Sequence, residues 1–232
     1  MMLPIDNFFR AAALWPDRIA VEIADADRCQ QISYAALADM TRAMATGLQA
    51  IDPQPQSRVG ICAYNNFEHL LAWLGCFAAG KVWVPLNPRN GVEELNRIID
   101  VTDPSVIIFD ADCADKFDCK TAQLISANGT HKRADDHIDD MLDRYKGAHP
   151  HTYQASPDDL QAIKFTSGST GMPKGVMQSY RVFNSCIASM LVSFEFDAAD
   201  RHLLVAPMTH GANTLIMPIF AVGGTQLFTH DS

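Results

Sequence analysis

Short apolar segments alternate with longer segments of helical periodicity between residues 58 and 109. The segments 58–62, 81–84 and 106–109 read as strands, and 67–79 and about 92–101 read as helices. Strands and helices that alternate in this way form βαβ units. The alternation therefore predicts an α/β fold made of layered, mostly parallel sheets with helices on both faces.

The same reading extends to the beginning of the chain. Residues 18–23 and 28–32 are predicted to form two strands around the turn Asp25-Ala26-Asp27. Ser33 is predicted to cap a helix, since Leu37, Met40, Met44 and Leu48 recur on one helical face.

The second half of the chain repeats the pattern after a polar stretch at 111–159. Residues 160–165, 202–206 and 226–228 are predicted strands, and 202–206 is expected to be buried. A helix is predicted after the first of them, from the apolar positions Phe183, Cys186, Ile187, Met190, Leu191 and Phe194.

Composition and charge narrow the class of protein. The chain has 232 residues, of which 48% are hydrophobic and 19% charged, and these values are typical of a soluble globular protein. Its net charge of -9 argues against a nucleic-acid partner, because binding a phosphate backbone requires a basic face. A nucleotide can still bind where a local loop provides the donors.

The cysteine spacing and the hydropathy of the chain predict a protein of the cytoplasm. No pair of the six cysteines has C-x-x-C spacing, so we expect free thiols, no zinc site and a cytoplasmic location. The start MMLPIDNFFR lacks the pattern of a signal peptide. The run LLAWLGCFAAG is too short to cross a bilayer and predicts a buried helix.

An acidic run, DDHIDD at 135–140, admits two interpretations. Its carboxylates and histidine could ligate a metal, or they could form the solvated face of a helix or loop. We favour the solvated interpretation and assign no metal ligand.

A glycine-rich loop, FTSGSTGMPKGVMQSY, begins at Phe165 and is expected to join a strand to a helix. Glycines let backbone N–H groups approach a phosphate, and hydroxyls and Lys174 add further donors. The spacing matches neither the Walker A pattern nor the dinucleotide fingerprint. A flexible surface loop is the alternative.

The ordered string from Thr166 to Val176 resembles the phosphate-binding signature of the adenylate-forming superfamily, which includes acyl-CoA synthetases, luciferases and peptide-synthetase adenylation domains. Three weaker resemblances follow the family's order. They are ISYAAL at 32–37, AGKVWVPLNP at 79–88 and APMTHG at 206–211.

The resemblance implies an acid–thiol ligase of the acyl-CoA synthetase branch, with a role in fatty acid metabolism. Such an enzyme joins a carboxylic acid to ATP, releases pyrophosphate and passes the acyl group to coenzyme A, with Mg²⁺ as a further cofactor. The residues implied to hold the outer phosphates are Thr166, Ser167, Gly168, Ser169, Thr170, Gly171 and Lys174. Lys174 is also implied in catalysis, since leaving pyrophosphate gathers charge.

His210 is the second residue to which the resemblance gives a catalytic role. In the family this histidine lines the acyl pocket and helps to gate between the half-reactions, whereas a lone histidine after a strand is more often structural. Thr209 departs from the aromatic residue that often precedes it. Adenylation domains for amino acids usually carry Phe-Asp here, so Thr209-His210 favours an acid without an α-amine.

The family's later motifs are not found in this sequence. Residues 1–232 therefore resemble the N-terminal part of the large AMP-binding domain, with the C-terminal domain absent, and we expect the chain to be inactive or nearly so alone. An exposed apolar face should then lead to homodimers or aggregation. The alternatives are a non-catalytic remnant that binds nucleotide or a partner, and an adenylation domain of another branch.

Overall fold

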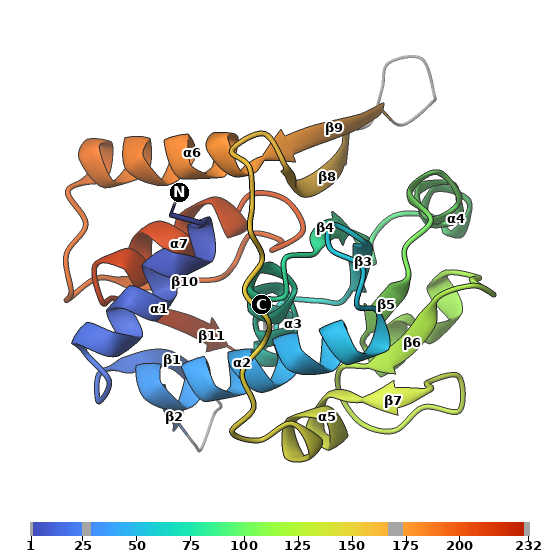
Figure 1. Ribbon diagram of the computed structural model, residues 1–232, viewed down its shortest axis with the longest axis horizontal. Helices are drawn as coiled ribbons and strands as arrows, with labels where there is room; N and C mark the ends of the chain where they lie inside the picture. The colour runs from blue at the N-terminus through green and yellow to red at the C-terminus, as the bar shows by residue number, and fades with distance from the viewer. Residues whose placement is uncertain (1, 25–28, 167–173, 230–232) are drawn as a thin grey trace.

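The computed structural model describes residues 2–24, 29–166 and 174–229, and these form two sheets with helices between and outside them (Figure 1). The smaller sheet has the order β10-β11-β1-β2, and the larger has the order β7-β6-β5-β3-β4-β8-β9. The strands of the smaller sheet are β1 (Ile19–Ala24), β2 (Cys29–Ser33), β10 (Arg201–Leu203) and β11 (Thr225–Thr229). Those of the larger are β3 (Arg58–Cys62), β4 (Val82–Pro85), β5 (Val106–Phe109), β6 (Gln123–Ser126), β7 (Asp136–His137), β8 (Leu160–Thr166) and β9 (Lys174–Ser179).

The helices form layers against both sheets. They are α1 (Pro4–Leu14), α2 (Tyr34–Ile51), α3 (Phe67–Ala78), α4 (Val92–Thr102), α5 (Ile138–Arg144), α6 (Tyr180–Phe194) and α7 (Asn213–Ala221), with a 3-10 turn at Ala111–Lys116. One core cluster joins α1, α2, α3 and α7 to residues of both sheets. A second cluster lies on the opposite face of the larger sheet, where α4 packs. The layered α/β prediction is confirmed.

Alternating side chains explain why the larger sheet is buried on both faces. In β5, Val106 and Ile108 belong to the first core cluster, and Ile107 and Phe109 belong to the second. Because successive side chains of a strand point to opposite faces, an uninterrupted apolar strand needs cover on both sides. The pairs β3–β4, β3–β5, β4–β8, β5–β6 and β6–β7 are all parallel.

The predicted cap of α2 is present. The backbone N–H of Ala36 donates to Ser33 Oγ at 3.2 Å. The next residue, Tyr34, is buried and donates its hydroxyl hydrogen to the carbonyl of Gly224 at 2.6 Å. The first turn of α2 is thus tied to the chain that enters β11.

The predicted strand-to-helix connection at the glycine-rich loop is wrong. The loop connects β8 to an antiparallel strand, β9, which pairs with it from Leu160–Ser179 to Thr166–Lys174, and α6 begins only at Tyr180. The segment KGVMQS has little apolar alternation, so its sequence does not predict a strand. Pairing with β8 along its backbone supplies the hydrogen bonds that make it the edge strand of the sheet.

The prediction of a buried strand at 202–206 is also wrong. Strand β10 covers Arg201–Leu203, and Leu203 and Val205 are exposed while only Leu204 of this segment is fully buried. Because β10 is an edge strand with incomplete cover, its apolar residues do not all face the core. The elements α1, α5, α7, β6, β7 and β9 were not predicted.

In the acidic run at 135–140, Asp136–His137 form β7 and residues 138–140 begin α5. Arg144 Nη1 donates a hydrogen bond to Asp136 Oδ2 at 2.6 Å, and Asp135 Oδ2 accepts the backbone N–H of Leu124 at 2.8 Å. Among the residues that the structure describes, no group of three or more His, Cys, Asp or Glu side chains is arranged to hold a metal ion.

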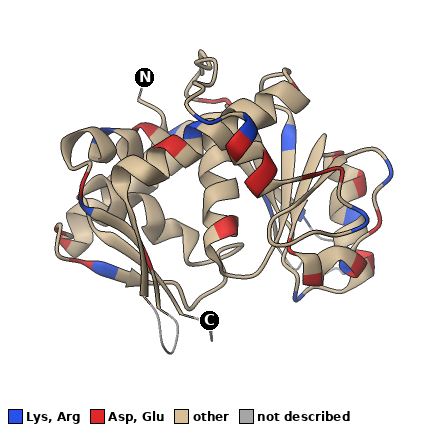
Figure 2. Ribbon diagram, turned by 90° about the horizontal axis from the view of Figure 1, so that it is seen from below, with Lys and Arg blue, Asp and Glu red and all other residues tan. Residues whose placement is uncertain are grey.

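Charged residues of both signs are mixed over the face shown in Figure 2. Over the described ranges, no helix is both long and apolar enough to cross a membrane. All six cysteines are free thiols.

Large apolar side chains are exposed on β9, on α6, and in the segment of β10 and the residues directly after it. The most exposed are Val192 at 82%, Met177 at 69%, Val205 at 62% and Phe194 at 59% of their full area. Exposed apolar area of this kind favours association.

We therefore expect the 232-residue chain alone to self-associate, which sedimentation over a concentration series would measure. Charged substitutions at Met177 and Val192 should restore a monomer, and a wild-type chain that stays monomeric at high concentration would contradict this expectation.

Candidate active site

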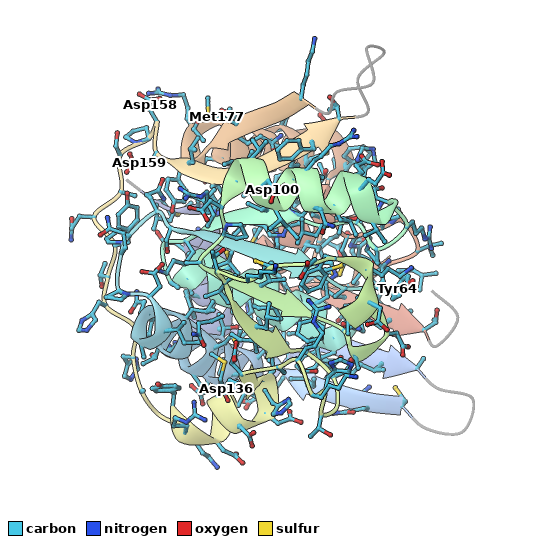
Figure 3. The ribbon with its side chains drawn as sticks, turned by 90° about the vertical axis from the view of Figure 1, so that its right-hand side faces the viewer. Tyr64, Asp100, Asp136, Asp158, Asp159 and Met177 are labelled. Carbon is cyan, nitrogen blue, oxygen red and sulfur yellow. The ribbon has the colours of Figure 1, made fainter. Side chains whose placement is uncertain are left out.

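The candidate site lies where the parallel strands of the larger sheet end. In Figure 3, Asp158 and Asp159, which precede β8, lie on the opposite side of the view from Tyr64, which follows β3. Since β3, β4 and β8 run in the same direction, the carboxyl end of β8 lies on the side of Tyr64. Ligands of open α/β sheets bind outside the carboxyl ends of the strands.

Thr166 and Lys174 form the base of the glycine-rich loop. They are paired across β8 and β9, and both are exposed. Within the described part of the chain, the Lys174 ammonium makes no hydrogen bond or ion pair. The predicted phosphate ligands Ser167, Gly168, Ser169, Thr170 and Gly171 lie outside the described residues. The described base of the loop thus offers one hydroxyl and one free cation to an anion.

Lys164 lies on the same sheet face as Thr166 and Lys174, because it precedes Thr166 by two residues in β8. Its Cα is about 7 Å from that of Thr166, from the rise of a strand. Its Nζ donates to Asn213 Oδ1 at 2.7 Å. The ammonium also lies over the rings of Trp83 and Phe183, at 5.1 and 5.5 Å from their centroids. Burial lowers the pKa of Lys164 to about 8.

Asn213 connects Lys164 to the segment that carries His210. Its Nδ2 donates to the carbonyl oxygens of Met208, at 3.0 Å, and of His210. Asn213 is buried, and these bonds fix which side of its amide faces Lys164. The turn at 207–212 and the strand β8 are thereby held together.

His210 itself is exposed at this turn. Its backbone N–H donates to the carbonyl of Pro207 at 2.9 Å, and its ring makes no hydrogen bond within the described residues. Thr209 is buried, and its hydroxyl has no hydrogen-bond partner there. The ring of His210 is therefore free to contact a ligand.

Asn65 holds the other side of the same turn. Its Nδ2 donates to the carbonyl oxygens of Leu204 and Ala206 at 2.9 and 2.8 Å, and its Oδ1 accepts the N–H of Met208 at 2.9 Å. Asn65 follows β3, so it couples the end of the larger sheet to the segment after β10. The buried carboxyl of Asp110 supports this end by accepting the N–H of Tyr64 at 2.8 Å, and burial raises its pKa.

A cavity of about 110 Å³ opens beside Lys164, between β8, β9, α6 and α7. Val182, Phe183, Ile187 and Met217 form its apolar wall. Lys164, Gln178, Asn213 and Thr214 provide its polar groups, together with the thiol of Cys186. A small apolar cavity with a few convergent polar groups is typical of a site for a small organic molecule.

Sequence reasoning singled out the loop and His210, which remain predictions, but not the residues that link the two segments. Lys164, Asn213 and Asn65 were not singled out. The available signal for Lys164 was a lysine within an otherwise apolar strand directly before the loop. No pattern in one sequence marks Asn65 or Asn213, because their partners lie in distant or turn segments.

The chain matches the model of the AMP-binding enzyme family over residues 8–232, and it belongs to this family of adenylate-forming ligases. This confirms the resemblance carried by the loop and the three weaker motifs.

The similar proteins include enzymes named as CoA synthases or ligases and an enzyme named as a gramicidin synthase. A feruloyl-CoA synthase from Amycolatopsis is 30% identical over 84% of this chain and 38% of its own length. A linear gramicidin synthase from Brevibacillus parabrevis is 26% identical over 93% of this chain and 3% of its own length. The structure of a putative long-chain-fatty-acid CoA ligase from Rhodopseudomonas palustris superimposes with a TM-score of 0.86 at 19% identity, over 98% of this chain and 57% of that one. The chain thus spans less than two thirds of the length of each protein.

Proposed function

We propose that this chain is the acid- and phosphate-binding part of an acyl-CoA synthetase. The enzyme joins a carboxylic acid to ATP, forming an acyl-adenylate and pyrophosphate, and then transfers the acyl group to the thiol of coenzyme A. The observation that carries the proposal is the free Lys174 ammonium beside Thr166, on the sheet face that also borders the cavity at Lys164. Membership of the AMP-binding family supports it.

Lys174 and Thr166 are proposed to hold the outer phosphates of ATP, together with Ser167, Gly168, Ser169, Thr170 and Gly171 of the undescribed loop. A cation placed at the leaving pyrophosphate stabilises charge that develops as the bond to the α-phosphorus breaks. The exposure of Lys174 and its lack of a partner among the described residues fit this task, since no existing ion pair must be broken.

His210 is proposed to line the acyl site, since its free ring sits on the turn that Asn213 ties to Lys164. The acid would lie between this turn and the cavity, with its carboxylate toward the loop. Mg²⁺ would bind with the nucleotide phosphates. We place its protein ligands, with those of the ribose and coenzyme A, outside residues 1–232.

The cavity favours the CoA-ligase branch over an amino-acid adenylation domain. An α-amino acid carries an ammonium group, and Lys164 would place a second cation close to it in a poorly solvated site. The Thr209-His210 pair also favours an acid without an α-amine. The free thiols are consistent with a cytoplasmic enzyme.

Acid-dependent ATP–pyrophosphate exchange by the full-length protein tests this function. We expect exchange that depends on a carboxylic acid, that does not occur with amino acids, and that is followed by thioester formation when coenzyme A is added. Exchange with amino acids alone would assign the chain to the peptide-synthetase branch. Nucleotide binding without exchange for any acid would favour the non-catalytic alternative.

A further inference from the structure

Among the described residues, Lys81 is fully buried and Lys164 is half-buried, and the two lysines differ in how their charge is satisfied. Lys81 is fully buried, and its Nζ donates to the carbonyl oxygens of Asp52 and Gln54 and to Ser57 Oγ. Within the described residues, Lys164 makes one hydrogen bond, to the neutral amide of Asn213. A lysine held away from water normally requires an anion or several acceptors. Within the described part of the chain, Lys164 therefore has fewer acceptors than Lys81.

No carboxylate lies within 4 Å of the Lys164 ammonium over the described ranges. The groups that face it are the Trp83 ring from β4, Phe183 and Cys186 from α6, Asn213 from α7 and Gln178 from β9. The two rings attract the cation, but they do not accept its remaining N–H groups in ordinary hydrogen bonds. Within the described residues, two of its three N–H groups have no acceptor and are available to a ligand in the cavity.

Gln178 is a second polar group that lines the cavity and lacks a partner among the described residues. Its Oε1 is buried without a hydrogen-bond partner, and its side-chain amide makes no hydrogen bond within the described residues. Gln178 pairs with Ala162 across β8 and β9, so it lies on the sheet face that carries Lys164. An amide in this position can turn its N–H groups toward an oxygen that Lys164 also binds.

Resting on the proposed function, we propose that the acid activated here carries a second carboxylate, and that Lys164, with Gln178, binds this distal group. The substrate class is then a short dicarboxylic acid. Its reacting carboxylate lies toward Thr166 and Lys174, and its distal carboxylate occupies the cavity between β8, α6 and α7. Lys164 is the residue that sets this specificity.

The charge of Lys164 disfavours an unbranched fatty acid in the same cavity. An alkyl chain against the ammonium would exclude water from it without supplying an acceptor. A distal carboxylate instead gives a charge-assisted hydrogen bond in a partly desolvated site. The cavity volume of about 110 Å³ also suits a short chain.

The pH dependence follows from the protonation of Lys164. Burial lowers its pKa to about 8, so the ammonium that binds the distal carboxylate is lost above that pH. Cys186 is the one other titratable group of the described residues that lines the cavity. We expect KM for the diacid to rise above about pH 8, and KM for the matching monocarboxylic acid to lack this rise.

The test compares acids of equal length in ATP–pyrophosphate exchange by the full-length protein. The pairs are butanoate and butanedioate, pentanoate and pentanedioate, and hexanoate and hexanedioate. We expect the best diacid to exceed its partner at least about 10-fold in kcat/KM. Lys164→Met should lower the value for the diacid about 10- to 100-fold, the effect of one charged hydrogen bond, and raise that for the monocarboxylic acid. Lys164→Arg should keep the preference for diacids.

Lys132→Ala, at an exposed lysine away from the cavity, is the matched control and should change neither value. Wild-type preference for monocarboxylic acids, or an equal loss for both acids in Lys164→Met, would overturn the proposal and leave the proposed function standing. So would a preference for a neutral distal group, such as the hydroxyl of 4-hydroxybutanoate. Calorimetric titration with pentanedioate distinguishes failure of the diacid proposal from failure of the proposed function. If pentanedioate binds to the wild type and not to Lys164→Met, but no acid supports exchange, only the proposed function is contradicted.

Discussion

Replacing Lys174 with alanine is expected to slow formation of the acyl-adenylate about 5- to 150-fold and to leave thioester formation nearly unchanged. The reason is that only the first half-reaction of the proposed activity expels pyrophosphate, and Lys174 is the free cation at the described base of the glycine-rich loop. The size corresponds to roughly 1–3 kcal/mol, the usual range for one charge-assisted hydrogen bond. Single-turnover measurement of each half-reaction in the full-length protein gives the two rates.

The control for this comparison is again Lys132→Ala, which removes an exposed lysine from another part of the surface. It should leave both half-reactions unchanged. If Lys174→Ala slowed both half-reactions alike, or neither, the loop would have a different role from the one proposed.

Methionine substitutions at Lys81 and Lys164 are expected to change the stability of the folded protein in opposite directions. Lys81→Met should destabilise the protein by about 2–4 kcal/mol, because the buried acceptors at Asp52, Gln54 and Ser57 lose their donor. Lys164→Met should stabilise it by about 1 kcal/mol at pH 7, because the removal of a poorly compensated charge outweighs the loss of one hydrogen bond to Asn213. Thermal and denaturant unfolding of the full-length variants measure both.

The stability of the wild-type protein relative to Lys164→Met is expected to increase with pH above about 8. The pKa of Lys164 is about 8 in the folded protein and near the ordinary lysine value of 10.5 in the unfolded chain. Between these values the unfolded chain binds more protons, so the stability of the wild-type protein rises with pH there. Lys164→Met should lack this rise. A destabilised Lys164→Met at pH 7 would mean that Lys164 is a structural lysine after all.

The parallel strands could be predicted from sequence because their environment leaves a simple pattern. Strands such as Val106–Phe109 are buried on both faces, so every residue is apolar and the segment stands out between helices. The N-terminus of α2 was predictable for a similarly local reason, since Ser33 caps the helix that begins one residue later.

The elements that sequence reasoning missed depend on distant partners. Strand β9 exists because its backbone pairs with β8, and its residues Val176 and Met177 are exposed. The link from Lys164 through Asn213 to His210 joins segments almost 50 residues apart. A single sequence does not show that such distant positions are in contact. Lys164 nevertheless gives a local signal, because a lysine within an apolar strand conflicts with the burial of that strand, and such conflicts occur at functional sites.

The most direct test of the central claim follows oxygen atoms through the reaction. The full-length protein is given ATP, coenzyme A and the acid that exchanges fastest, with its carboxylates labelled with ¹⁸O. Attack of a carboxylate oxygen on the α-phosphorus, with loss of pyrophosphate, followed by attack of the thiol on the carbonyl carbon, leaves one labelled oxygen in AMP. Mass spectrometry should therefore find one ¹⁸O per AMP and none in pyrophosphate. Label in inorganic phosphate, or unlabelled AMP alongside the thioester, would contradict activation through an acyl-adenylate.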